Sequence, residues 1–386
     1  MESRRAYLDH AATTPMRPEA RAAMLPYLTG EFGNPSGAHH ESRRARRAVD
    51  DARETVGRLL GADLGEVVFT SGGTEADNLA VVGGWRAMAA GRPTPPAIVC
   101  SAIEHHAVLE TCRALARATG AELREVPAGP LGVVDADAWA EACTAEVGLV
   151  SVMAVNNEIG TVQNLHSLAE SARAGSPAAV LHTDAVQAAP WLPMGPLTQD
   201  FDLVTISAHK VGGPKGVGAL AVRHGTALEP LAHGGGQERE RRSGTQNVAG
   251  IVALAAALDR SPEEQAAENR RVAALRDRLA EGLLASVPDS AWTGSRYSVP
   301  GLCHLRFAGI ESEALVLLLD ERGVAVSAGA ACSSGAVEAS HVLLAMGFDK
   351  TEARSGIRFS LGWTTTDEDV DRALAVVPDA VAKLRD

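Results

Sequence analysis

The chain has 386 residues, of which 46% are hydrophobic and 22% charged, and its formal net charge at pH 7 is −12. This length exceeds one ordinary hydrophobic core, so we expect two domains. The acidic balance disfavours direct binding to nucleic acid, which requires a basic face. The N-terminus lacks the apolar stretch of a signal peptide, and no apolar run approaches the roughly 18 residues that a membrane helix requires.

The five cysteines are odd in number and widely spaced, without a C-x-x-C pair. This pattern disfavours a disulfide framework and a thiolate metal site, so we expect no metal. Unpaired thiols are typical of proteins in a reducing compartment, and we therefore expect the protein to be cytoplasmic.

Helical and strand patterns alternate over the first 260 residues. Helices are predicted over 17–28, 41–60, 75–90 and 107–119, and strands over 66–70, 97–100, 148–153, 179–182, 203–206 and 218–222. Continuous apolar strands between helices indicate an α/β fold with a mainly parallel sheet covered on both faces. Ligands of such sheets bind at the carboxyl ends of the strands.

The pattern changes in the last third of the chain. Residues 249–258 and 263–284 are predicted as one long helix or a helix pair. Strands over 301–307 and 356–361 then alternate with helices over 312–321 and 366–384, separated by a loop of small residues. These elements predict a separate, smaller α+β domain.

Lysine is rare in this sequence, since only four of the 36 basic residues are lysines. Lys210 follows a predicted strand, beside His209 and ahead of a Gly-rich turn. An ammonium group can lose its proton and become a nucleophile, whereas a guanidinium cannot. Taken alone, Lys210 is about equally well explained as a Schiff-base lysine and as a solvated loop residue.

Polar residues follow four other predicted strands. Each has a simple structural explanation, such as a helix cap for Asp184 or a tight turn for the segment 71–75. Together, however, they would gather at one edge of the sheet with Lys210: Ser71-Gly-Gly-Thr74, His105, Asn156-Asn157 and Asp184 with Gln187. Pyridoxal phosphate is bound by groups of these kinds: a turn of small residues for its phosphate, an acid, amides and one lysine.

The ordered motifs resemble those of cysteine desulfurases, which are class V, aminotransferase-like pyridoxal-phosphate enzymes. The resemblance covers nearly the whole chain and includes Tyr7-Leu-Asp-His-Ala-Ala-Thr-Thr-Pro15, Phe69-Thr-Ser-Gly-Gly-Thr-Glu75, His182-Thr-Asp-Ala-Val-Gln187, Ser207-Ala-His-Lys210, Ala331-Cys-Ser-Ser334 and Ile357-Arg-Phe-Ser-Leu-Gly362. It implies fold type I of the pyridoxal-phosphate transferases, with a seven-stranded sheet. We expect a large cofactor-binding domain over 15–260 and a small domain over 1–14 and 261–386.

The resemblance also implies roles for single residues around the cofactor ring. Lys210 would form the Schiff base and move protons at the substrate. Asp184 would pair with the ring nitrogen, while Gln187 and Asn157 would bind the hydroxyl side of the ring. His105 would stack on the ring face and take part in proton transfer.

Further roles concern the cofactor phosphate and the substrate. The phosphate would lie against Gly73, Thr74, Ser207 and His209, joined by Thr245 from the neighbouring subunit of a homodimer with a shared active site. For the substrate, the resemblance implies a carboxylate bound by Arg358, with Asn34 and Asn157 assisting.

Cys332 is the residue on which the predicted activity depends. It lies among small residues, and the run 332–343 resembles the subgroup with the longer catalytic loop. The resemblance implies that its thiolate takes sulfur from L-cysteine as a persulfide, leaves L-alanine and passes the sulfur to an acceptor protein. Iron–sulfur cluster assembly, tRNA thiolation and DNA phosphorothioation all use such a donor.

Three alternatives to a cysteine desulfurase follow from the same residues. A selenocysteine lyase or an aminotransferase could use the same scaffold, and Cys332 distinguishes them. A non-catalytic binding scaffold would carry no cofactor. A nucleotide-binding protein is disfavoured because the Gly-rich turns lack a Walker lysine.

Overall fold

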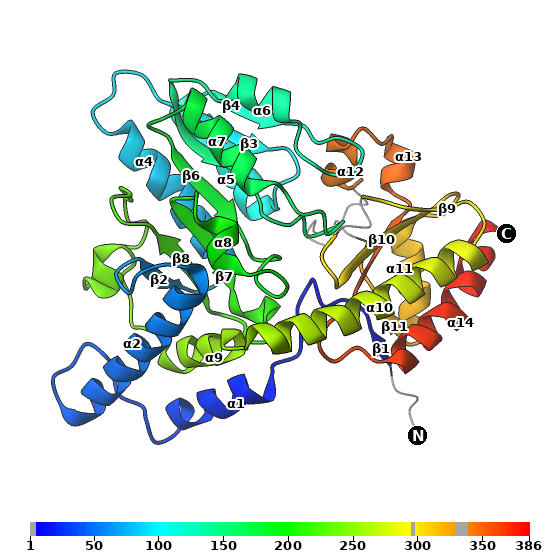
Figure 1. Cartoon of the computed structure of the whole chain (residues 1–386), viewed down its shortest axis with the longest axis horizontal. Coiled ribbons are helices and arrows are strands. Elements are labelled where there is room, and N and C mark those ends of the chain that lie inside the picture. The colour runs from blue at the N-terminus through cyan, green and yellow to red at the C-terminus, as the bar shows by residue number, and fades with distance from the viewer. Residues whose placement is uncertain (1–4, 295–297, 329–338) are drawn as a thin grey trace.

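The computed structural model describes residues 5–294, 298–328 and 339–386. In this part of the chain, seven strands form the central sheet of an α/β layer (Figure 1). In spatial order they are β2 (Val67–Thr70), β8 (Gly218–Val222), β7 (Leu203–Ser207), β6 (Val180–Asp184), β5 (Val147–Ser151), β3 (Ala97–Ser101) and β4 (Leu123–Val126). β8 runs opposite to the other six strands of this sheet, so the predicted mainly parallel sheet is confirmed.

Alternate residues of these strands enter two apolar cores on opposite faces of the sheet. Val68, Ile98 and Leu149 belong to one core, while Val67 and Val99 belong to the other. Successive side chains of a strand point to opposite faces, so burial on both faces requires the continuous apolar runs seen in the sequence. β4 was not predicted because its residues are mostly half-buried or exposed at the edge of the sheet.

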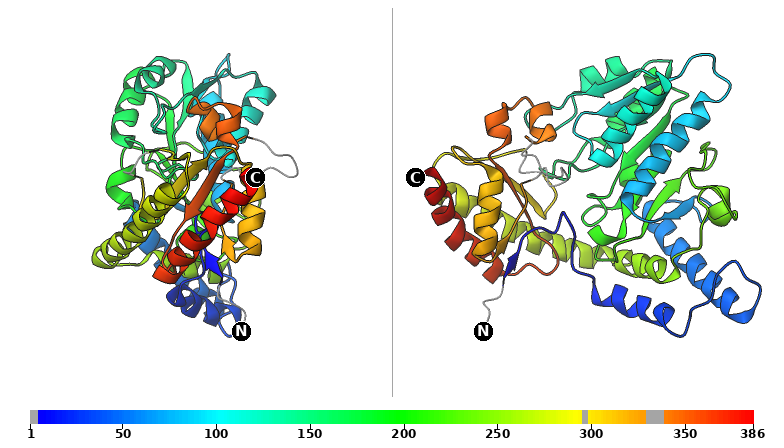
Figure 2. Two further views of the ribbon diagram at one scale, coloured as in Figure 1. Left: turned by 90° about the vertical axis from the view of Figure 1, so that its right-hand side faces the viewer. Right: turned by 180° about the vertical axis from the view of Figure 1, so that it is seen from behind.

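Helices cover both faces of this sheet (Figure 2). They are α1 (Pro18–Met24), α2 (His40–Leu60), α3 (Gly73–Asn78), α4 (Gly84–Ala89), α5 (His106–Thr119), α6 (Ala136–Ala142), α7 (Leu165–Gly175), α8 (Met194–Thr198) and α9 (Val248–Leu258). The helix predicted over 75–90 is α3 and α4 joined by a π-helical turn, Leu79–Gly83. α6, α7 and α8 were not among the predicted elements.

A second α+β unit is built from the C-terminal part of the chain and the first strand. Its sheets are β12 (Gly356–Ser360), β10 (Leu302–Phe307) and β9 (Ser290–Trp292), and the pair β1 (Ala6–Tyr7) and β11 (Val324–Ala325). Its helices are α11 (Ser312–Glu321), α12 (His341–Ala345), α13 (Lys350–Ala353) and α14 (Asp367–Arg385). The domain boundaries expected from the sequence stay a prediction.

The long helix α10 (Pro262–Ser286) runs from the large sheet layer to the second unit (Figure 1). It is separate from α9, so the helix pair is the correct alternative. Ser261 caps α10 in a capping box with Glu264, and Pro262 occupies its first turn. Proline disfavours a helical conformation at the residue before it, which explains the break. Within the described residues, no helix is long and apolar enough to cross a membrane.

A buried ion pair holds the loop that precedes Thr245. Arg53 on α2 binds both carboxylate oxygens of Glu238, at 2.6 and 2.9 Å, and Glu238 also accepts from the backbone N–H of Phe69. Glu238, Arg239 and Glu240 have φ values of 48°, 56° and 65°. Non-glycine residues in this left-handed region are strained by roughly 1–3 kcal/mol each, so the ion pair must hold the loop in place.

We expect Glu238→Gln to lower the free energy of unfolding by about 3–5 kcal/mol, because it leaves the Arg53 charge buried without its partner. Urea denaturation of the purified protein measures this change. Arg58→Met is the matched control: it removes an exposed pair with Asp259 from the same helix and should cost less than about 1 kcal/mol. Equal losses in the two variants would contradict the structural role of Glu238.

Candidate active site

A cavity of about 330 Å³ opens at the carboxyl ends of the strands. Asp184 and Ser207 are the last residues of β6 and β7, Gly73 and Thr74 begin α3 after β2, and His105 precedes α5. The structure brings together ten of the predicted site residues around this cavity: Gly73, Thr74, His105, Asn157, Asp184, Gln187, Ser207, His209, Lys210 and Arg358.

Two of the predicted site residues lie away from this cavity. Asn34 lies exposed before α2, where its side chain accepts from the backbone N–H of Ser36. Thr245 is exposed in the loop before α9, and neither residue lines the cavity. Cys332 lies outside the described residues. Sequence reasoning missed Asp77, which also lines the cavity, although it lies three positions beyond Thr74 on the same helix.

Lys210 ends the 3-10 turn that follows β7. Its Nζ donates to the backbone oxygens of Ala11 and Ala12, at 2.5 and 2.9 Å. These oxygens belong to the N-terminal segment, so the chain passes directly beside the amine. Lys215, the other lysine of this region, is exposed. The geometry therefore selects Lys210 as the lysine that a ligand in the cavity would meet.

Two buried carboxyl groups face the cavity at the end of β6. Asp184 Oδ1 accepts from Val186 N at 2.9 Å, and burial raises the pKa of Asp184 to about 6. Burial, followed by the nearby Asp184 charge, raises the pKa of Asp77 well above its ordinary value. Two like charges in a desolvated site cannot both be stable. A cationic group of a ligand would favour the ionised form of Asp184.

A neutral histidine, His182, lies next to these two carboxyl groups. His182 is completely buried, and its ring nitrogens contact the hydroxyls of Ser151 at 2.9 Å and Thr205 at 3.1 Å. Its Nε2 also lies 3.6 Å from Asp77 Oδ1. Burial lowers the pKa of His182 to about 3, so the ring is uncharged at neutral pH.

His105 is the N-cap residue of α5, and its hydrogen bond defines its tautomer. Its Nδ1 accepts from the backbone N–H of Ala107 at 3.1 Å and caps the helix. Burial, and then the charge of Lys210, lower the pKa of His105 to about 4. A neutral imidazole that accepts at Nδ1 carries its proton on Nε2. His105 can therefore offer one N–H to a bound group.

Another part of the cavity lining suits an anion. Backbone N–H groups at the start of α3 meet Ser207 and His209 there. A Cβ on Gly73 would lie 3.1 Å from Val186 and 3.4 Å from Ser207, so a side chain at this position would crowd the turn. Helix N-termini with close backbone approach are typical phosphate sites.

Arg358 on β12 brings a buried guanidinium to the cavity. Its Nη1 donates to Asn157 O and its Nη2 to Asp9 Oδ1, both at 2.9 Å. Within the described residues, its Nε has no hydrogen-bond partner. Asp9 was quoted in the sequence without a role, and the structure identifies it as the carboxylate that fixes Arg358.

Comparisons with known proteins found similarity over nearly the whole chain. The family model of the class V aminotransferases matches residues 6–373. A cysteine desulfurase of Cereibacter sphaeroides is 45% identical over 384 residues, covering 99% of this chain and 97% of that protein. The solved structure of a NifS-like protein is similar with a TM-score of 0.91 and 34% identity, over 98% of this chain and 100% of that one. The structure titled SspA in complex with cysteine is similar with a TM-score of 0.80 and 32% identity, over 92% and 99%.

The chain belongs to the class V aminotransferase family. This family implies pyridoxal phosphate as cofactor, and the residues of the cavity fit it. Within the described residues, three buried polar atoms along the cavity lack a hydrogen-bond partner: Asp77 Oδ1, Asn157 Oδ1 and Ser207 Oγ. Buried polar groups are rarely left unpaired, so these atoms indicate that the cavity is shaped for a polar ligand.

The buried His182 makes stability depend on pH. An unfolded histidine binds a proton below about pH 6.5, whereas His182 in the folded protein does so only near pH 3. The unfolded state therefore gains protons first as the pH falls. Between pH 7.5 and 5 we expect His182 to lower the free energy of unfolding by about 2 kcal/mol. His182→Gln should remove this part of the pH dependence in urea denaturation, and an unchanged pH dependence in the variant would contradict the buried neutral state.

Proposed function

We propose that the protein is a cysteine desulfurase that converts L-cysteine to L-alanine and carries the sulfur as a persulfide on Cys332. One cavity combines Lys210, Asp184 and His105 with the guanidinium of Arg358, and this observation carries the proposal. Full-length similarity to a cysteine desulfurase supports it. The reaction is balanced when the substrate sulfur joins the thiol of Cys332 and alanine receives a proton in its place.

Pyridoxal phosphate bound at Lys210 supplies an electron-withdrawing ring that weakens the bonds at the substrate Cα. Asp184 would hold the nitrogen end of this group, and Thr74, Ser207 and His209 would hold its phosphate. The Lys210 amine would move protons at the substrate. His105, neutral with its proton on Nε2, would offer that N–H to the bound group.

Arg358 binds the substrate carboxylate in this proposal. Arg358 lines the cavity, while Asp9 and Asn157 keep the guanidinium plane fixed. Ion pairs with planar guanidinium groups are strong and directional. Asn34 is exposed, so its assistance to the substrate has weaker support than that of Asn157.

The residues on either side of the Cys332 segment support its role. Ser327 and Arg358 exchange backbone hydrogen bonds, at 2.7 and 3.2 Å. On the other side, Ser340 Oγ donates to Glu158 Oε2 at 2.6 Å, and His341 Nε2 contacts Glu104 O at 2.9 Å. Both flanks are thus fixed beside the cavity. Cys332 follows Ser327 by five positions, a reach of at most about 17 Å.

The remaining assignments concern partners. The sulfur acceptor is a protein in this proposal, and the chain acts as a cytoplasmic homodimer. Thr245 lies exposed outside this chain's own cavity, which suits a residue that serves the phosphate of a neighbouring subunit. The alternatives, a selenocysteine lyase or an aminotransferase, would not require Cys332 for sulfur release from cysteine.

We expect Cys332→Ala to keep the visible absorption of the bound cofactor and to lose sulfide release from L-cysteine in the presence of a reductant. Cys143→Ala is the control, because Cys143 is buried and burial raises its pKa to about 11, so it is not a thiolate. Full desulfurase activity in Cys332→Ala would exclude the proposed mechanism. Absence of a borohydride-reducible cofactor at Lys210 in the wild type would favour a non-catalytic scaffold.

Arg358→Lys tests the carboxylate site. A lysine keeps the charge but loses the planar fork of donors, and one charge-assisted hydrogen bond contributes about 1.5–3 kcal/mol. We therefore expect the KM for L-cysteine to rise about tenfold to hundredfold while cofactor affinity stays near the wild-type value. Steady-state kinetics and cofactor titration measure the two quantities, and an unchanged KM would count against this assignment.

A further inference from the structure

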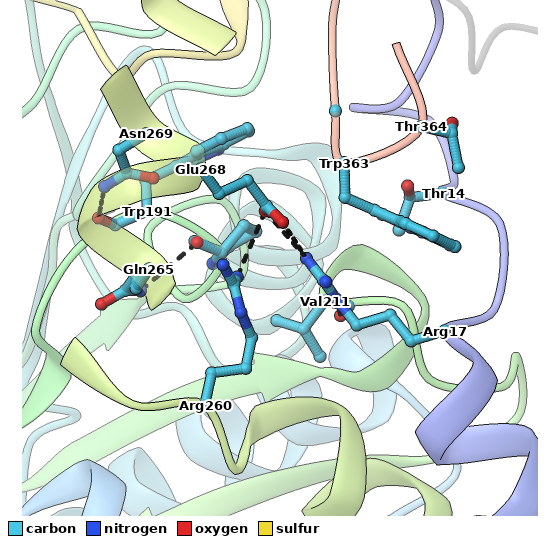
Figure 3. A network of polar contacts seen from close by, with 12 residues as sticks. Thr14, Arg17, Trp191, Val211, Arg260, Gln265, Glu268, Asn269, Trp363 and Thr364 are labelled. Atoms are coloured by element: carbon cyan, nitrogen blue, oxygen red, sulfur yellow. Dashed lines mark hydrogen bonds and ion pairs between the residues drawn. The ribbon is translucent and has the colours of Figure 1, made fainter. Parts of the chain in front are cut away.

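A cluster of charged residues lies close to the turn that carries Lys210. Arg17, Glu268 and Arg260 form it, and the ring of Trp363 lies beside Arg17 (Figure 3). Lys210 lines both the main cavity and a small second cavity of about 30 Å³ that also borders these residues. Arg17, Glu268 and Arg260 thus border a cavity that Lys210 also lines, and none of the three lines the main cavity.

Arg17 forms two hydrogen bonds with the backbone directly after Lys210. Its backbone N–H donates to Gly212 O at 2.8 Å, and its Nε donates to Val211 O at 3.2 Å. Gly212 has a φ of +89°, and a Cβ there would lie 2.6 Å from Arg17 Cγ. The two segments thus approach so closely that only glycine fits, and a shift of Arg17 would be transmitted to the lysine turn.

Glu268 on α10 fixes the guanidinium of Arg17. Its two carboxylate oxygens accept from Arg17 Nη2 at 2.8 and 3.0 Å, and Arg260 Nη1 lies 3.3 Å from Oε1. The side chains of Arg17 and Glu268 are only 15% and 16% exposed. Solvent screens such a pair less than a surface pair, so the geometry of Arg17 is well determined.

Trp363 connects the same arginine to the strand of the substrate-binding residue. It follows β12, which carries Arg358. The centre of its ring lies 5.2 Å from the Arg17 guanidinium carbon, and its Nε1 donates to Pro15 O at 3.0 Å. An arginine over an indole ring is a favourable cation–π contact. Arg17 therefore contacts the lysine turn, α10 and the chain that continues β12.

We propose that Arg17, oriented by Glu268, is a positioning residue that fixes the Lys210 amine relative to the Arg358 guanidinium. The inference rests on the proposed function in one respect: the Lys210 amine and the Arg358 guanidinium must contact the same substrate at a fixed spacing. It requires no contact between Arg17 and the cofactor. Misplacement of a reacting group by about 1 Å can lower the rate by as much as about a hundredfold.

Arg17→Met, Arg17→Lys and Glu268→Gln test the proposal in the cofactor-loaded enzyme. We expect Arg17→Met to lower kcat about tenfold or more and to shift the pH titration of the visible cofactor band, because the Lys210 amine moves. Arg17→Lys, which can reach Glu268 but cannot also hold Val211 O, should recover only part of kcat. Glu268→Gln keeps the shape of the side chain and should show a smaller change in the same direction.

Arg278→Met is the matched control for helix α10. It removes an exposed ion pair with Asp367 and Asp371 from the same helix and should leave kcat and the pH titration unchanged. The double variant Arg17→Met/Glu268→Gln should resemble Arg17→Met alone, since Glu268 acts through Arg17. Additive losses in the double variant would overturn the proposal.

Two outcomes separate this inference from the proposed function. A wild-type enzyme without desulfurase activity would refute the proposed function, while the pH titration of the cofactor band would still test the role of Arg17. A lower melting temperature of Arg17→Met without the cofactor, combined with wild-type kcat and pH titration in the loaded enzyme, would show that Arg17 has a purely structural role.

Discussion

The backbone of residues 9–17 runs between the lysine turn and β12 and forms hydrogen bonds with both. His10 N donates to Ser360 O and Thr14 N to His209 O, each at 3.1 Å. Asp9 at one end fixes Arg358, and Arg17 at the other end holds the carbonyls after Lys210. The lysine and the arginine of the site come from different structural units, and this segment contacts both of them.

Burial of titratable groups gives the site its second constraint. Asp184, Asp77 and Glu104 are all buried, and burial raises the pKa of each. The histidines around them are neutral for the same reason, since burial disfavours their charged forms. Burial therefore disfavours the charged forms of these carboxyl and imidazole groups. A ligand with a cationic ring nitrogen and an anionic phosphate supplies the charges that these residues can stabilise.

Much of the large sheet could be predicted because its strands are buried on both faces and so appear as continuous apolar runs. The polar residues at the strand ends could be found for the same reason, since the end of each run marks the edge of the sheet. β4 escaped prediction because its half-exposed residues lack that pattern. Asp77 escaped it because a single acid in a helix resembles an ordinary solvated residue.

The sequence by itself determined the chemistry of the site, because Asp184 ends an apolar strand and Lys210 and His105 lie in the short segments that follow two others. Only the tertiary structure decided how these groups are held. Arg358 and Asp9 are 349 positions apart, and Arg17 and Glu268 are 251 positions apart. Local patterns carry no information about such partners, since the packing of the second unit against the large sheet brings them together.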